Sequence, residues 1–230
     1  MILKDKRLVK HVSKELNIEL QIKLLSDMHL GSGKADVNLD ADIVYDENGM
    51  PYFPAKRLKG LLYESAKEIF EMSAVSGKLL FTEEAVENLF GHNTAVRQDS
   101  SCQMIIHNLY LQDYEQNKNA WDYLTSQYPA ILNSQAVLDE YTYIRYQTSI
   151  DEVTGTALEH SLHNLRVLKA GCCFEGTIRI INGDAQAELI MAAACKNLHY
   201  AGGKRNRGLG KLDCSFPNME AIISSGLKRR

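Results

Sequence analysis

Residues Ala201 to Lys211 read A-G-G-K-R-N-R-G-L-G-K and join the last expected helix, 185–198, to the last expected strand, 211–216. Glycine lets the backbone take positive φ angles and approach a partner closely, and interleaved cations then flank N–H groups that can face an anion. The spacing matches neither a P-loop nor a dinucleotide-binding fingerprint. We therefore expect a phosphate chain to bind here; the alternative is a solvated, flexible loop. The residues concerned are Gly202, Gly203, Lys204, Arg205, Arg207, Gly208, Gly210 and Lys211.

Alternating apolar residues predict the strands. Ile18, Leu20, Ile22 and Leu24 alternate with polar residues over 17–25, which indicates a half-buried strand. Further strands are predicted over 102–111, over the aromatic run 141–147 and from Phe174 to about residue 180. In the aromatic run, Tyr141, Tyr143 and Tyr146 either pack in the core or stack on bases, and the alternation favours core positions for two of the three.

Helical spacing predicts a helix that starts near Lys56 and continues through Leu58, Leu62 and Phe70. Lys56, Arg57 and Lys59 occupy its first turn, where the helix dipole disfavours cations. Cations at that end suggest a bound anion, because helix N-termini are anion-binding sites. Solvated side chains are the alternative. A second helix is predicted from its N-cap Thr82 to Phe90.

The order of these elements predicts an α+β fold with a ferredoxin-like β-α-β-β-α-β core, the plan that RNA-recognition motifs also use. The aromatic motif of those RNA-binding domains is absent. Residues 112–135 are polar and predict an insertion. Residues 149–165 are long and polar for a connection, so we expect them to be functional and to lie outside the core.

Length and composition predict a soluble protein. A chain of 230 residues with 45% hydrophobic residues suits one domain. The net charge of −3 argues against nucleic-acid binding unless the basic segments form a local surface. Five cysteines without a C-x-x-C motif fit reduced thiols. No apolar run predicts a membrane span or a signal peptide, so we expect a cytoplasmic location and no membrane partner.

Several blocks occur in an order that resembles one family. They are M-H-L-G-S-G at 28–33, D-E-N-G-M-P-Y-F-P-A-K-R-L-K-G at 46–60, L-F-G at 89–91, S-I-D-E-V-T-G-T-A at 149–157 and G-G-K-R-N-R-G-L-G-K at 202–211. The chain resembles the RAMP (repeat-associated mysterious protein) superfamily of CRISPR proteins over most of residues 17–216. Its nearest likeness is the backbone subunit of type III effector complexes.

The resemblance implies a single RAMP domain over 1–230, with a thumb-like hairpin over 141–166. Such a subunit stacks in copies along a CRISPR RNA guide, beside other type III effector subunits, and holds a target RNA paired with the guide. The glycine loop and the first-helix cations would hold guide phosphates. The resemblance extends the RNA-binding set to His29, Ser32, Arg145 and Thr154.

The resemblance also implies cleavage of the target RNA, supported by a loop aspartate after the first strand. Asp40 is the first candidate, as catalytic residue and metal ligand, and Asp36 the second. Mg²⁺ or Mn²⁺ would be the cofactor, since Mg²⁺ takes few protein ligands and keeps several waters. Two alternatives stay open. One is a scaffold without cleavage; the other is a stand-alone repeat-RNA processing enzyme that would use His199 and Tyr200.

Overall fold

The computed structural model describes residues 15–35, 38–91 and 103–228. Its strands are β1 (Glu15–Leu24), β2 (Tyr52–Phe53), β3 (Gln103–Ile106), β4 (Leu109–Leu111), β5 (Thr142–Gln147), β6 (His163–Leu168), β7 (Cys173–Ile181) and β8 (Leu212–Ser215). Its helices are α1 (Ala55–Val75), α2 (Glu83–Phe90), α3 (Tyr114–Gln127), α4 (Ser134–Tyr141), α5 (Ala185–Asn197) and α6 (Met219–Lys228), with a 3₁₀ turn at Arg205–Arg207.

The main sheet has the ferredoxin-like strand order. Strands run β2-β4-β7-β1-β8, and β3 also pairs with β7. Every pairing among them is antiparallel, with Ile18 opposite Ile178 and Ile22 opposite Phe174. Helices α1 and α2 lie between β2 and β3 in the chain, and α5 connects β7 to β8. The predicted β-α-β-β-α-β core is confirmed.

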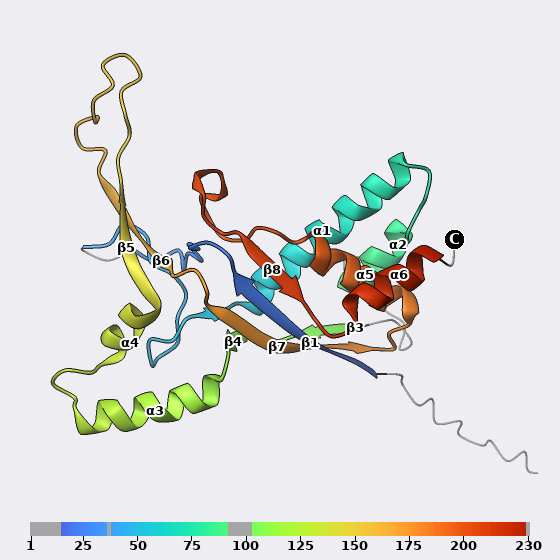
Figure 1. Ribbon diagram of the computed structural model, residues 1–230, viewed down its shortest axis with the longest axis horizontal. Coiled ribbons are helices and arrows are strands. Elements are labelled where there is room, and N and C mark those ends of the chain that lie inside the picture. Colours follow the sequence, from blue (N-terminus) through green and yellow to red (C-terminus); the bar gives the residue numbers. More distant parts are fainter. Residues whose placement is uncertain (1–14, 36–37, 92–102, 229–230) are drawn as a thin grey trace, which may run out of the picture.

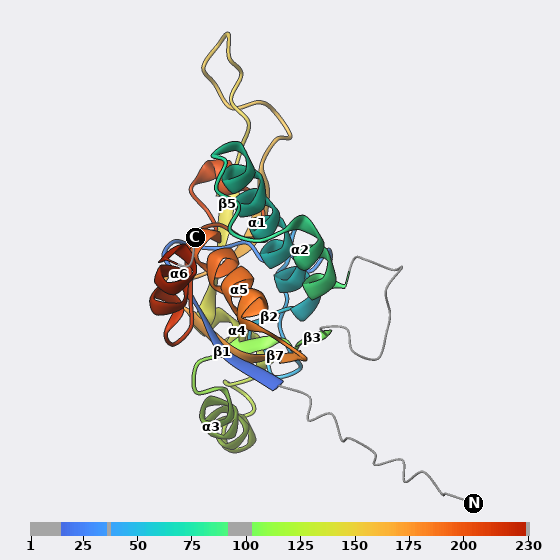
Figure 2. The ribbon, with the colours of Figure 1, turned by 90° about the vertical axis from the view of Figure 1, so that its right-hand side faces the viewer.

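Helices cover one face of this sheet. Figure 2 shows α1, α2, α5 and α6 on that side and α3 on the other. The apolar residues of β1 that alternation predicted are all buried, and Leu58 and Leu62 of α1 pack in the same core. Ser65 Oγ on α1 donates a hydrogen bond of 2.7 Å to the carbonyl oxygen of Ala194 on α5. This contact links the two crossover helices.

The opposite face of the sheet is polar. Glu19 and Gln21 of β1 lie beside Thr177 and Glu175 of β7 in the pairing register, and Gln21 Nε2 donates to Glu175 Oε1 at 2.9 Å. RNA-recognition motifs stack bases on aromatic residues of this face. Over β1 and β7 this face instead carries polar and charged side chains of both signs.

The segment from β4 to β5 is more ordered than a plain insertion. Residues 112–135 contain α3 and the beginning of α4, which continues to Tyr141. Trp121 Nε1 donates to Tyr141 Oη at 3.3 Å, so the two helices are joined where α4 leads into β5. The predicted strand over 102–111 is two strands in its described part, separated at His107 and Asn108.

Strands β5 and β6 form a separate two-stranded sheet, and the loop between them projects away from the body (Figure 1). The pairing runs from Thr142 opposite Leu168 to Gln147 opposite His163. Residues 148–162 form its long tip. We call β5, β6 and this tip the hairpin; they span 142–168, compared with the 141–166 inferred from the resemblance.

Two expectations for the hairpin are wrong. Leu165 is buried at its stem, so the segment 149–165 does not lie wholly outside the core. Tyr143 and Tyr146 are exposed, so at most one of the three tyrosines packs in the core. A two-stranded sheet with both faces near solvent removes the burial that alternation normally indicates. Among the described helices, none is long and apolar enough to cross a membrane.

Candidate nucleic-acid interface

The glycine loop, residues 201–211, is folded tightly against the segment that follows β1. Gly202 and Gly210 have φ angles of 79° and 82°. A Cβ at Gly210 would lie 2.0 Å from the carbonyl oxygen of Ala201, and one at Gly202 would lie 2.6 Å from that of His29. Both positions need glycine for conformation and for space. Lys204 also takes the left-handed conformation, with φ 57°, which is uncommon for a residue with a side chain.

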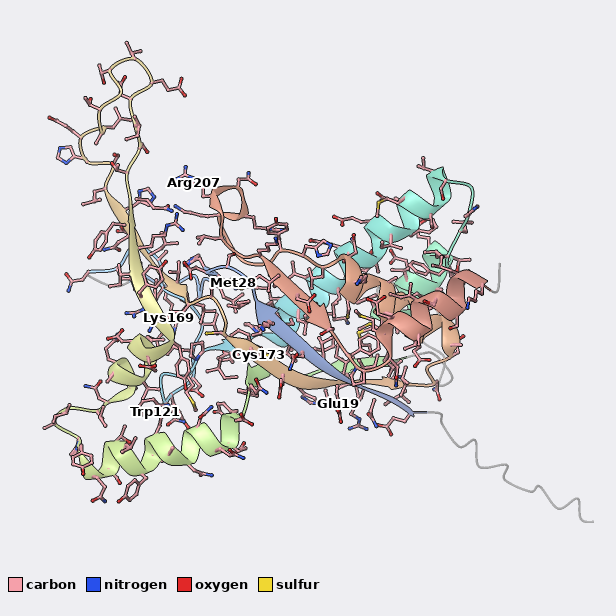
Figure 3. All side chains as sticks on the ribbon, viewed as in Figure 1. Glu19, Met28, Trp121, Lys169, Cys173 and Arg207 are labelled. Carbon is pink, nitrogen blue, oxygen red and sulfur yellow. The ribbon has the colours of Figure 1, made fainter. Side chains whose placement is uncertain are left out.

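The N–H groups of this loop are largely occupied by the protein itself. Gly203 donates to the carbonyl oxygen of His29 at 2.9 Å, Gly208 to that of Arg205 at 3.3 Å and Gly210 to that of Asp27 at 2.7 Å. The expectation of a bare backbone facing an anion is therefore wrong at these three glycines. The exposed side chains of Arg205 and Arg207 remain for that role. Arg207 lies at the outer end of the loop, beside the hairpin (Figure 3).

His29 is a structural centre of this region. Its Nδ1 donates to the carbonyl oxygen of Arg166 on β6 at 2.8 Å, since a carbonyl oxygen can only accept. A Cβ at Gly31 would lie 2.7 Å from His29 Nε2, so the glycine turn closes over the ring. His29 thus joins the post-β1 loop to both the glycine loop and the hairpin.

The start of α1 reaches the same region. Arg57 Nη2 donates to the carbonyl oxygen of Gly31 at 2.8 Å, and α1 has no acidic residue in its first turn. Lys56 is exposed. Lys59 instead points toward α2, with Nζ 3.9 Å from the Cβ position of Gly91. The structure therefore brings Arg57 to the loop after β1, on which the glycine loop packs, and directs the Lys59 ammonium elsewhere.

The stem of the hairpin packs directly on the glycine loop. Leu165 and Val167 of β6 form a small buried cluster with Leu209. Lys204 Nζ donates to Gln147 Oε1 of β5 at 2.8 Å. Arg145 lies on the same face of β5 as Gln147, because alternate residues of a strand share a face. The loop and the stem therefore form one continuous surface.

The cations of this surface are available to a ligand. Within the described ranges, no carboxylate lies within salt-bridge distance of Lys56, Arg57, Arg145, Lys204, Arg205, Arg207 or Lys211. Lys211 is exposed and pairs through its backbone with Tyr200. The net charge of the protein is −3, but an anion near this surface responds to the local positive potential of these cations.

Two other residues predicted to contact RNA, Thr154 and Ser32, make hydrogen bonds within their own loops. Thr154 is in the hairpin tip, where its N–H and that of Val153 donate to Asp151 Oδ1. These two bonds lower the pKa of Asp151. Ser32 Oγ donates to the carbonyl oxygen of Asp42 at 3.1 Å and so stabilises its own loop.

Asp40 is exposed and anchored to the hairpin. Its Oδ2 accepts from the N–H of Asn164 at 2.7 Å, and its own N–H donates to Asn164 Oδ1 at 2.9 Å. Asp36 lies outside the described residues. No group of three metal-ligating side chains occurs in the part of the chain that the structure describes. A metal held at Asp40 would take most of its ligands from water and RNA, as Mg²⁺ commonly does.

A family model described as the RAMP superfamily matches residues 21–213. This chain belongs to the RAMP superfamily. The RAMP fold also matches a chain in the cryo-EM structure of the type III-B Cmr-beta bound to cognate target RNA, with 13% identity and a TM-score of 0.59, over 90% of this chain and 99% of that one. A chain of the apo-state Cmr-beta structure matches equally well at 14% identity. At these identities the likeness shows the fold alone. No curated protein sequence matches the chain.

Sequence reasoning missed a residue that organises this RAMP surface. Arg166 is 6% exposed; its Nε lies 3.1 Å from Asp42 Oδ1 and its Nη1 2.9 Å from Asp139 Oδ1. The same Nη1 donates to Thr142 Oγ1. It thereby ties the post-β1 loop to α4 and β5. The available signal was a cation amid apolar residues of a strand, in N-L-R-V-L at 164–168.

A second missed contact also positions the hairpin of this RAMP protein. Tyr143 Oη donates to Asp27 Oδ2 at 2.6 Å, and Asp27 Oδ1 accepts from the N–H of Ala170. The bond to Asp27 raises the pKa of Tyr143, and partial burial adds to the effect. Asp27 also accepts from Gly210 through its carbonyl. One aspartate therefore holds β5, the β6–β7 turn and the glycine loop together.

Proposed function

We propose that this RAMP protein is an RNA-binding subunit of a type III CRISPR effector complex and that it holds the guide RNA by its phosphates. The observation that carries the proposal is the convergence of the α1 start, the glycine loop and the hairpin stem, through His29 and Gly31. RAMP membership and the fold shared with a chain of the Cmr-beta structure support it.

The chemistry of this surface suits backbone binding without sequence reading. Its exposed groups are mainly ammonium and guanidinium cations, and phosphate contacts position a nucleic acid without specifying its bases. Guide RNA would run over the glycine loop beside the hairpin. Target RNA would pair with that guide, and neighbouring copies or other subunits would meet the hairpin tip.

We propose further that the bound target RNA is cleaved with the help of Asp40. Asn164 holds the Asp40 carboxylate at the hairpin stem, where an RNA lying on the loop would pass. A Mg²⁺ or Mn²⁺ ion at Asp40 would supply charge stabilisation at a phosphate. The described residues would supply only a small part of the ligands of such an ion. A scaffold without cleavage is therefore the alternative. A stand-alone processing enzyme is less favoured, because the buried and positioned groups centre on His29, and His199 and Tyr200 are both exposed.

Alanine at Lys204, Arg205 and Arg207 together tests the RNA-binding proposal. We expect weaker binding of every guide sequence and a log–log salt slope smaller by about 2, since each phosphate contact on a single strand contributes about 0.7. Fluorescence anisotropy over a salt series measures both. Alanine at Lys67, Lys118 and Lys196 is the matched control; each of these lysines lies in an ion pair away from the loop. Loss of affinity for one guide sequence alone would contradict the proposal.

A further inference from the structure

Three side chains from distant parts of the sequence meet where the glycine loop contacts the hairpin. Lys204 Nζ lies 2.8 Å from Gln147 Oε1 and 3.1 Å from His163 Nε2. Gln147 and His163 are partners at the end of the β5–β6 pairing. The Lys204 ammonium therefore spans the last pair of the stem, directly below the hairpin tip.

The hydrogen bonds define the form of the His163 ring in this arrangement. Nδ1 lies 2.9 Å from the carbonyl oxygen of Ser161, which can only accept, so Nδ1 carries a hydrogen. Nε2 must then use its lone pair to accept from the Lys204 ammonium, which has donors only. This contact requires a neutral imidazole. A protonated ring would direct a second N–H at the ammonium.

Other charged groups lie on the elements next to His163. Arg145 lies two residues before Gln147 on the same face of β5, so the β5 side is cationic. The Asp40 carboxylate accepts from the N–H of Asn164, the next residue of β6. An anion placed between Lys204 and His163 would find donors on both sides, provided that the imidazole gains a proton.

We propose that Lys204 and His163 form a clamp for one phosphodiester group and that the clamp takes up one proton when RNA binds. A phosphate oxygen replaces Nε2 as the acceptor for Lys204. The proton enters from solvent at Nε2, and the imidazolium then donates to the same phosphate. The inference rests on the proposed RNA-binding function and adds His163 to the residues that contact the guide.

The affinity of the full-length protein for a labelled, unstructured single-stranded RNA tests the clamp at constant ionic strength. Imidazoles change charge between about pH 5 and 8, so we expect the wild-type protein to bind about five to ten times more tightly at about pH 6 than at about pH 8. His163→Gln, which stays neutral, should lose this gain. His160→Gln, in the exposed tip, is the matched control and should keep it.

Titration calorimetry in two buffers of different ionisation enthalpy measures the proton directly. Uptake should accompany RNA binding by the wild type and by His160→Gln, and should be absent in His163→Gln. An unchanged pH gain or unchanged uptake in His163→Gln would overturn the clamp while the proposed function stands. Failure of the wild type to bind RNA at low salt at either pH would overturn both.

Discussion

Arg166 shows how a single buried charge can order the candidate site. Its guanidinium bonds Asp42 and Asp139, from the post-β1 loop and from α4, and its carbonyl oxygen accepts from His29. The Asp42 side chain is 15% exposed and that of Asp139 is 58% exposed. The Asp42 partner is therefore the one that would be left buried without a counter-charge.

Arg166→Ala should lower the free energy of unfolding by about 3 kcal/mol, the lower end of the range for breaking a buried ion pair, because Asp139 can regain solvent. Urea denaturation measures the change. Arg179→Ala removes an exposed pair with Glu15, in which the two side chains are 45% and 41% exposed, and should cost less than about 1 kcal/mol. If Arg166→Ala lowers the free energy of unfolding as little as Arg179→Ala is expected to, the buried network is not stabilising.

Asp40 is the residue on which cleavage depends in our proposal. Asp40→Asn keeps an oxygen that can accept from the N–H of Asn164 but removes the charge. We expect target-RNA cleavage in Mg²⁺ or Mn²⁺ to fall by about 100-fold, as for loss of one preorganised electrostatic group, with guide and target binding nearly unchanged. Single-turnover cleavage of labelled RNA measures this.

Asp36→Ala is the control for Asp40 and should cut at close to the wild-type rate. If Asp36→Ala is inactive and Asp40→Asn is active, the assignment of the two aspartates is reversed. A wild-type complex that leaves target RNA intact in both metals would make the protein a scaffold only.

At the scale of elements, the glycine loop combines two demands. It must turn sharply enough to leave α5 and enter β8, and it must lie against the loop after β1. Comparison of Gly208 with Gly210 separates the two demands. Both residues have left-handed φ angles, 78° and 82°, so they differ only in the space around them. A Cβ at Gly208 would meet nothing within 4 Å, whereas one at Gly210 would lie 2.0 Å from the Ala201 carbonyl oxygen.

Gly208→Ala should therefore lower the free energy of unfolding by about 1 kcal/mol, the cost of a left-handed residue with a side chain. Gly210→Ala should lower it by more than about 3 kcal/mol, because the backbone must move as well. Thermal or urea unfolding of the pair measures the difference. Similar stabilities would mean that the loop does not lie as closely against Ala201 as the structure shows.

At the scale of the whole molecule, the hairpin tip has the character of an interaction surface. Four apolar side chains of the tip are between 46% and 95% exposed: Ile150, Val153, Leu158 and Leu162. Exposed apolar residues grouped in one place are typical of contact sites. The bonds of the tip are internal: Leu158 N–H donates to the carbonyl oxygen of Ser149 and Asp151 N–H to that of Thr156.

Replacing residues 148–162 with Asn-Gly tests this view, since that dipeptide suits a two-residue turn between the paired Gln147 and His163. We expect cooperative unfolding with a midpoint within about 4 °C of the wild type, retained binding of a short RNA by one copy, and loss of ordered assembly on long RNA. Sedimentation velocity measures assembly. Loss of cooperative unfolding would make the tip part of the core, and normal assembly would remove its role as a contact.

The sequence by itself determined the elements whose signals are local. Alternation placed β1 and β7. The helix predicted from the N-cap Thr82 to Phe90 is α2, and the order of strands and helices was sufficient for the ferredoxin-like core. These signals succeed because burial of one face imposes a period of 2.0 or 3.6 on the residues themselves. The glycine loop was also visible, since its backbone conformation selects glycine.

Only the tertiary structure decided which groups meet. Gly203 and Gly210 donate to carbonyls of the loop after β1, and Lys204 bonds Gln147 and His163, which lie 57 and 41 residues away in sequence. Arg166 became buried because α4 and that same loop supply carboxylates on both of its sides. No local period encodes such partners, because each hydrogen bond depends on where the sheet brings separate segments together.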